Sequence, residues 1–194
     1  MRAYVEAYGC ALNFGESREI EDMLTSRGWD LVSEPEDCDL AVLVTCVVIE
    51  TTERAMLKRV EALSSAPRLL VTGCMATACR ERAEEVSPDA LFVAPGDLST
   101  MAEIIGADTS PPKPIENARN TYGIVPIASG CAGSCAYCIT RLARGRLRSR
   151  PEGTIVGKVE VLARSGPVEV QLTAQDTAAY GTDLGSDLPR LVER

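Results

Sequence analysis

The sequence predicts an α/β protein whose first part is an open parallel sheet, and three observations support this. Short apolar runs alternate with amphipathic stretches over residues 1–106. Two of these runs, 40–45 (LAVLVT) and 69–72 (LLVT), are almost entirely apolar, which is typical of parallel strands buried on both faces. The stretches between the runs carry apolar residues at spacings of three and four, as helices do. Strand and helix therefore alternate, which is the order of a parallel α/β sheet.

The elements of this first part follow one another in that order. The predicted strands are 3–8, 40–45 and 69–72, and the predicted helices are about 15–28, 51–63 and 77–86. Ile20, Met23 and Leu24 form the apolar face of the first helix. Asn13 lies just before it, and asparagine commonly caps a helix, so we expect Asn13 to be its N-cap.

The second part begins after a proline-rich segment with no apolar period, residues 107–121, which we interpret as a linker. A strand at 122–128, a helix at about 152–165 and a strand at 168–173 follow, and a last helix begins near Asp187. This is one βαβ unit and part of the next helix, too little for a closed barrel. The predicted division is therefore 1–106, the linker 107–121, and 122–194.

The composition limits which catalytic groups and metal ligands the chain can provide. The chain has 28 acidic and 20 basic residues, a net charge of −8 and no histidine. Without histidine, the commonest general base and a common zinc ligand are absent. No apolar run is long enough for a membrane span, and the N-terminus has no signal-peptide core, so we expect a cytoplasmic protein with no membrane partner. Eight cysteines in that reducing compartment suggest metal or redox chemistry before disulfides.

Three of the cysteines, Cys131, Cys135 and Cys138, occupy one tight loop with the spacing C-x3-C-x2-C. Structural zinc takes four protein ligands, and a [4Fe–4S] cluster normally takes four thiolates. A cluster held by only three would keep one iron open to a substrate or cofactor. We interpret the loop as a site of that kind.

Three other cysteines, Cys10, Cys46 and Cys74, each follow a predicted strand by at most two residues. The carboxyl ends of parallel strands share one edge, where ligands bind, so these residues are expected to form a second metal site. Burial in the core is the usual fate of a single cysteine. We apply that interpretation to Cys38, in an acidic loop, and to Cys79, which we place within a helix.

Several segments occur in the order that is seen in one known family. They are YGCALN, VTCVVIETTER, TGCMA, CAGSCAYCITRLARGRLRSRP and LTAQDTAAYGTD. The sequence resembles the radical S-adenosylmethionine methylthiotransferases over nearly all its length, and it is most similar to the archaeal and eukaryotic type. The resemblance implies a flavodoxin-like N-terminal α/β sheet followed by the start of a radical-SAM partial (β/α) barrel.

The resemblance also implies two [4Fe–4S] clusters and S-adenosylmethionine as cofactors. One cluster would sit on Cys131, Cys135 and Cys138 and bind S-adenosylmethionine. The other would sit on the three strand-end cysteines and hold the sulfur for transfer. The cofactors would carry the reaction, so no side chain is assigned as catalytic.

The substrate that the resemblance implies is N6-threonylcarbamoyladenosine next to the anticodon of tRNA, with an electron donor of unknown identity. Methylthiolation of a ribosomal-protein aspartate is the alternative within the family. Family members are longer, so we expect the chain to be truncated and inactive by itself. From other classes, a zinc or RNA-binding module and a ferredoxin-like electron carrier remain open.

Two further features adjoin the cysteine loop. Five arginines lie between residues 141 and 150, and their forked guanidinium groups suit phosphates or the carboxylate of S-adenosylmethionine. A solvated basic loop is the alternative. Gln175 and Asp176 follow a strand of the second part, where the loops of barrels carry sites, and Gln175 is predicted to bind the cofactor.

Overall fold

The computed structural model describes residues 1–106, 122–164, 166 and 169–194. The chain divides into two compact units, Met1–Ile115 and Glu116–Arg194, and each is described by itself. The predicted linker, 107–121, lies outside the described residues.

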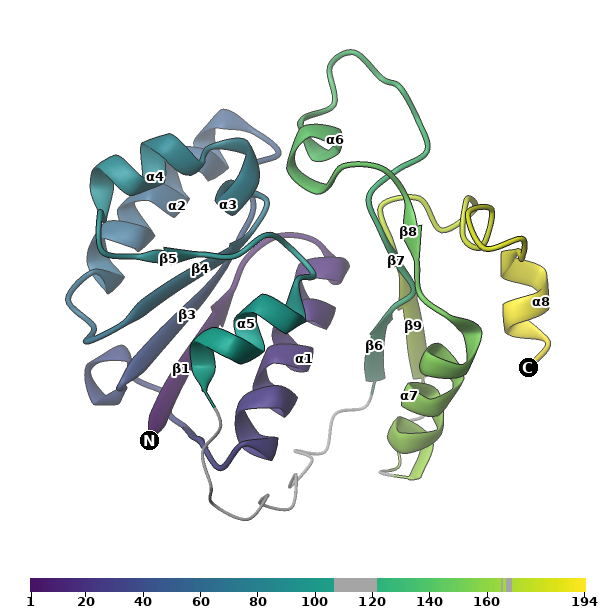
Figure 1. Ribbon diagram of the computed structural model, residues 1–194, viewed down its shortest axis with the longest axis horizontal. Coiled ribbons are helices and arrows are strands. Elements are labelled where there is room, and N and C mark those ends of the chain that lie inside the picture. The colour runs from purple at the N-terminus through teal and green to yellow at the C-terminus, as the bar shows by residue number, and fades with distance from the viewer. Residues whose placement is uncertain (107–121, 165, 167–168) are drawn as a thin grey trace. The chain divides into compact units, whose positions relative to one another are not determined.

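The first unit is built on a parallel sheet of five strands in the order β2-β1-β3-β4-β5 (Figure 1). The strands are β1 (Arg2–Ala7), β2 (Asp30–Leu31), β3 (Leu40–Thr45), β4 (Leu69–Gly73) and β5 (Leu91–Phe92). Every residue of the central strand β3 is buried, as its uninterrupted apolar sequence requires. The predicted α/β class and parallel sheet are confirmed.

Helices cover both faces of this sheet (Figure 1). They are α1 (Ala11–Ser26), α2 (Glu50–Leu63), α3 (Met75–Ala78), α4 (Arg80–Val86) and α5 (Leu98–Ile105), with a 3-10 turn at Pro35–Asp37. Ile20 and Leu24 of α1 and Met101 and Ile105 of α5 pack with the strands and the buried Trp29 in one core cluster. Burial of this apolar surface from both sides stabilises the sheet.

Two local predictions for this unit were wrong, and one helix was missed. Helix α1 begins at Ala11, with Cys10 at the N-cap, so Asn13 lies inside the helix and does not cap it. The predicted helix 77–86 is two helices that meet at Cys79, which therefore lies between helices. Helix α5 was missed, although Asp97 caps it by accepting a hydrogen bond from the Thr100 amide at 3.1 Å.

The second unit contains a parallel pair of strands, β6 (Tyr122–Pro126) and β9 (Glu169–Thr173). The helix α7 (Glu152–Arg164) lies between them in sequence and packs on β6. Val125, Ile127, Ile155, Tyr180 and Leu191 form the buried core. The predicted βαβ order is therefore present.

The predicted strand 122–128 is interrupted. β6 ends at Pro126, and a separate short strand β7 (Ala128–Ser129) pairs antiparallel with β8 (Arg148–Ser149). Proline has no amide hydrogen for a strand ladder, which explains a break at this position. The ribbon β7–β8 encloses the cysteine loop and the short helix α6 (Ile139–Arg144), and α8 (Leu188–Val192) ends the described chain.

Candidate functional site

The three strand-end cysteines follow neighbouring strands of the first unit. Cys46 comes directly after β3 and Cys74 directly after β4, while Cys10 lies three residues beyond β1. β3 is paired with β1 on one side and with β4 on the other, so the three loops leave the same edge of the sheet. Cys46 and Cys74 are 8% and 5% exposed, and Cys10 is exposed.

Asn13 joins two of these loops. Its side chain is fully buried, and Nδ2 donates hydrogen bonds to the carbonyl oxygens of Tyr8 at 2.6 Å and Thr45 at 2.9 Å. The thiol of Cys10 lies 3.9 Å from Asn13 Oδ1. Asn13 therefore links the ends of β1 and β3 through hydrogen bonds. No local sequence pattern predicted this role.

Two glycines allow the loops to come this close. Gly9 has φ +116°, and a Cβ there would lie 2.8 Å from the Cβ of Cys46. Gly73 has φ +83°, and a Cβ there would lie 2.4 Å from the Thr45 carbonyl oxygen. Side-chain-bearing residues avoid both the conformation and the contacts, so each position requires glycine.

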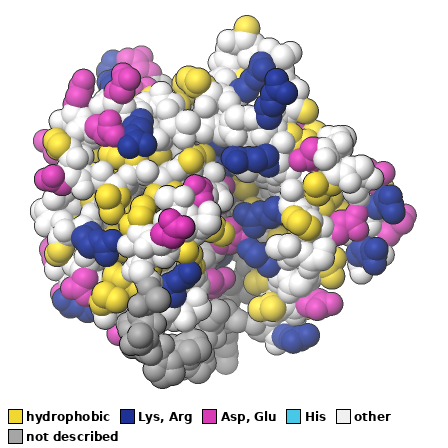
Figure 2. All heavy atoms as spheres, viewed as in Figure 1, with side chains coloured by type: hydrophobic (Ala, Val, Ile, Leu, Met, Phe, Trp, Pro, Cys, Tyr) yellow, Lys and Arg dark blue, Asp and Glu magenta, His cyan; other side chains and the backbone are white. Residues whose placement is uncertain are grey.

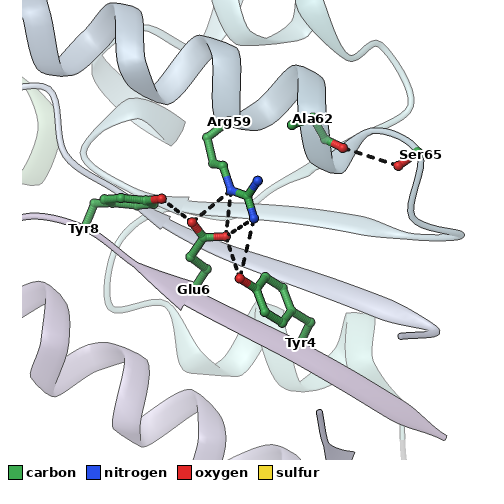
Figure 3. A network of polar contacts seen from close by, with 6 residues as sticks. All are labelled: Tyr4, Glu6, Tyr8, Arg59, Ala62 and Ser65. Carbon is green, nitrogen blue, oxygen red and sulfur yellow. Dashed lines mark hydrogen bonds and ion pairs between the residues drawn. The ribbon is translucent and has the colours of Figure 1, made fainter. Parts of the chain in front are cut away.

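A polar network anchors β1 next to this edge (Figure 3). Arg59 of α2 donates from Nε to both carboxylate oxygens of Glu6 at 2.8 Å. Its Nη2 forms an ion pair with Glu6 Oε2 at 2.6 Å. The hydroxyls of Tyr4 and Tyr8 also donate to Glu6. Burial works to raise the pKa of Glu6, but the hydrogen bonds from Arg59, Tyr8 and Tyr4 outweigh it and lower that pKa. Sequence reasoning missed this network because its partners come from different elements.

In the second unit, Cys131, Cys135 and Cys138 lie on the loop between β7 and α6. The Cys131 amide donates to the carbonyl of Gly145 at 3.2 Å, which closes the base of the loop. Gly130 has φ +77°, and a Cβ there would lie 2.1 Å from the Arg146 carbonyl oxygen. The glycine before the first cysteine therefore lets the two arms of the loop meet.

The surroundings of Cys138 favour its thiolate form, which is the form that binds metal. The amide of Gly133 donates to Cys131 Sγ at 3.2 Å. Cys138 is the N-cap of α6, and hydrogen bonds from the Arg141 backbone and from Thr140 lower its pKa. In these respects the donor set fits a thiolate-ligated cluster.

The remaining predicted residues lie as follows. Gln175 Oε1 accepts a hydrogen bond from the amide of Gly130, and Asp176 accepts one from the amide of Ala179. Of the five arginines, Arg144 is buried and donates to Ser129 Oγ, whereas Arg141, Arg146 and Arg148 are exposed. Figure 2 shows Lys and Arg side chains gathered over the region of α6 and β8.

The two cysteines that we set aside differ in their surroundings. Cys38 is buried, and burial raises the pKa of its thiol. Burial, followed by the charge of Glu53, raises the pKa of Cys79. Among the described residues, no three Cys, Asp or Glu side chains are already gathered around a point where a metal ion could bind.

Comparison with known proteins gives a consistent result. Residues 2–94 match the family described as "Uncharacterized protein family UPF0004". A "Probable threonylcarbamoyladenosine tRNA methylthiotransferase" of Methanothermobacter thermautotrophicus is 32% identical to this chain. The alignment covers the whole chain and 49% of that relative. A protein of the same name from Methanocaldococcus jannaschii is 33% identical over 99% of the chain and 48% of its own length.

A second kind of relative is also similar. A "Ribosomal protein uS12 methylthiotransferase RimO" of Ectopseudomonas mendocina is 30% identical over 91% of the chain and 43% of its own length.

No helix in the described part of the chain is long and apolar enough to cross a membrane. The chain spans about half the length of the curated relatives it matches. Along nearly all of its length, the chain is therefore similar to methylthiotransferases.

Proposed function

We propose that this protein transfers a methylthio group to N6-threonylcarbamoyladenosine of tRNA by radical S-adenosylmethionine chemistry with two [4Fe–4S] clusters. The observation that carries the proposal is the presence of two separate sets of three cysteines in this chain. The whole chain also aligns with about half of an archaeal protein called a threonylcarbamoyladenosine tRNA methylthiotransferase. An electron donor and the anticodon loop of tRNA are its implied partners.

Each set of cysteines would hold one cluster. Cys131, Cys135 and Cys138 would bind the cluster that takes S-adenosylmethionine, and Cys10, Cys46 and Cys74 would bind the auxiliary one. Three thiolates leave one iron of a four-iron cluster available to another ligand. When bound, the first cluster and S-adenosylmethionine supply a 5′-deoxyadenosyl radical, which is chemistry that no side chain here can perform.

The chain's own residues would hold and orient these groups. Hydrogen bonds from Arg141 and Thr140 lower the pKa of Cys138 and favour its thiolate, and the amide of Gly133 donates to Cys131 Sγ. Gln175 contacts the loop at Gly130, so we infer that it serves the cofactor by positioning the loop. The exposed Arg141, Arg146 and Arg148 are available for phosphates or for the carboxylate of S-adenosylmethionine.

The first test is iron binding. Anaerobic reconstitution of the full chain should yield about eight iron and eight sulfide per chain, and about four of each when either set of cysteines is changed to alanine. A protein that binds only zinc, or no metal, would contradict the proposal and favour a structural module.

The substrate requires a separate test. Methylthiolation of a ribosomal-protein aspartate is the second candidate, and the 30% identity to the RimO relative supports it. The matches to the tRNA enzymes cover more of the chain, 99–100% against 91%. Mass spectrometry of digested tRNA nucleosides and of the ribosomal protein, after expression in a strain that lacks both modifications, would separate the two.

A further inference from the structure

Thr45, the last residue of β3, contacts all three cysteine-bearing loops of the first unit, either directly or through Asn13. Its carbonyl oxygen accepts two hydrogen bonds, from Cys74 N at 3.0 Å and from Asn13 Nδ2 at 2.9 Å. Its hydroxyl donates to the carbonyl of Thr72 and accepts from Met75 N at 3.1 Å. We call these contacts the Thr45 network.

The network connects the loops in a definite way. Cys46 follows Thr45 directly in the chain. Thr72 and Met75 lie on the two sides of Cys74, so the Thr45 side chain brackets that cysteine. Asn13 extends the network to the first loop, because its Nδ2 also donates to the carbonyl of Tyr8, two residues before Cys10.

The surroundings of Thr45 are adapted to these contacts. Thr45 is fully buried, so each of its polar groups needs a protein partner. Gly73 has the positive φ and the missing Cβ that let β4 end against the Thr45 backbone, where a Cβ would lie 2.4 Å from its oxygen. Gly9 likewise has a positive φ and no Cβ, so the loop that carries Cys10 can lie close to Asn13, where a Cβ would lie 2.8 Å from Nδ2.

We propose that Thr45 is a positioning residue for the auxiliary cluster. Thr45 holds the Cys10, Cys46 and Cys74 loops in register with one another before the cluster binds. This inference rests on the proposed function, because it requires a cluster at those three cysteines. Partners outside the ligand set that fix ligand loops are a general feature of metal sites. Hydrogen bonds of Thr45 and Asn13 tie the backbones of the three loops together.

The test uses the full chain in which Cys131, Cys135 and Cys138 are replaced by alanine, so that only the auxiliary site can bind iron. Three substitutions are compared in that background. Thr45→Val removes the hydroxyl at nearly constant volume, and Thr45→Ser restores it. Thr72→Val is the matched control, because it removes a buried hydroxyl from the next strand and leaves the carbonyl that Thr45 contacts.

Iron and sulfide per folded chain, and the electron paramagnetic resonance spectrum of the reduced cluster, are the readouts. Thr45→Val should weaken iron binding about tenfold or more and alter the spectrum, as losses of such supporting contacts typically do. Thr45→Ser and Thr72→Val should match the background chain. Circular dichroism gives the folded fraction, so a merely structural role would reduce that fraction without changing the cluster of the folded molecules.

The outcomes separate the two proposals. If the background chain binds no iron, the auxiliary cluster itself is wrong. If it binds a cluster and Thr45→Val binds the same cluster equally well, the positioning role is overturned. Should Thr45→Val fail to fold, Asn13→Ala takes its place, because it cuts the link to the Cys10 loop and leaves the Thr45 hydroxyl. An unchanged cluster in that variant would overturn the inference as well.

Discussion

The side chain of Gln175 accepts a hydrogen bond from the backbone amide of Gly130 at 2.8 Å, across 45 residues of sequence. Gly130 directly precedes the first cysteine of the loop, and Gln175 follows β9. The contact therefore ties the start of the cysteine loop to the end of the strand that pairs with β6. The loop is fixed to the sheet by a residue outside the loop itself.

We expect Gln175→Ala to impair the radical cluster. Loss of the acceptor frees the loop and leaves the Gly130 amide without this partner, at a cost of about 1–3 kcal/mol. Iron at the Cys131, Cys135 and Cys138 site, measured with the other three cysteines replaced, should bind about tenfold more weakly. Gln171→Ala, on the exposed side of the same strand, is the control and should bind iron normally.

Cys135→Ala should abolish the radical cluster alone. The two sets of cysteines belong to different compact units, so each site is expected to form independently. After anaerobic reconstitution, iron should fall to about half, because one of the two four-iron clusters remains. Equal loss of iron from both sites would show that they depend on each other.

Gly73→Ala should destabilise the first unit strongly. The new methyl group meets the Thr45 backbone oxygen at 2.4 Å, and φ +83° disfavours alanine in any case, so the cost should reach about 3 kcal/mol or more. Gly96→Ala separates the two effects, because Gly96 has φ +77° and its nearest neighbour would be Glu16 Oε1 at 3.7 Å. That variant should lose only about 1–2 kcal/mol. Chemical denaturation of both variants measures the difference, and equal losses would exclude a steric role for Gly73.

Glu6→Gln should destabilise the protein at neutral pH and much less in acid. The pKa of Glu6 is lower in the folded state, so its carboxylate stabilises the fold above the unfolded pKa of about 4.5, and that contribution disappears as the pH falls through the folded value. At pH 7 the loss should be about 1–3 kcal/mol, since charged hydrogen bonds to Arg59, Tyr4 and Tyr8 are weakened.

Thermal unfolding of the wild-type and Glu6→Gln chains from pH 7 to pH 3 tests this dependence. Burial raises the pKa of Glu21 and Asp22, so these groups favour the fold in acid and contribute with the opposite sign. The difference between the two chains cancels their effect and isolates Glu6. A gap in Tm that stays constant across this range would show that the ionised carboxylate is not the stabilising form.

Much of the fold could be predicted from local patterns. Continuous apolar runs identified β3 and β4 to within a residue, and periods of three and four identified α2 nearly to its ends. The predicted helix 152–165 also matches α7 closely. The two-residue strands β2 and β5 were missed because so short a segment carries no period. The break after β6 was missed because residues 122–128 look continuous in composition, although Pro126 marked its position.

The sequence by itself determined that the first sheet is parallel and that Cys10, Cys46 and Cys74 each follow one of its strands. Only the tertiary structure decided how those ends are joined. Asn13 reads as a helix cap in sequence, yet it bonds the Thr45 carbonyl 32 residues away. Periodicity reports which residues are buried, because burial repeats with the local geometry of helix and strand. Hydrogen bonds between distant residues depend on strand order and register, which exist only once the chain has folded.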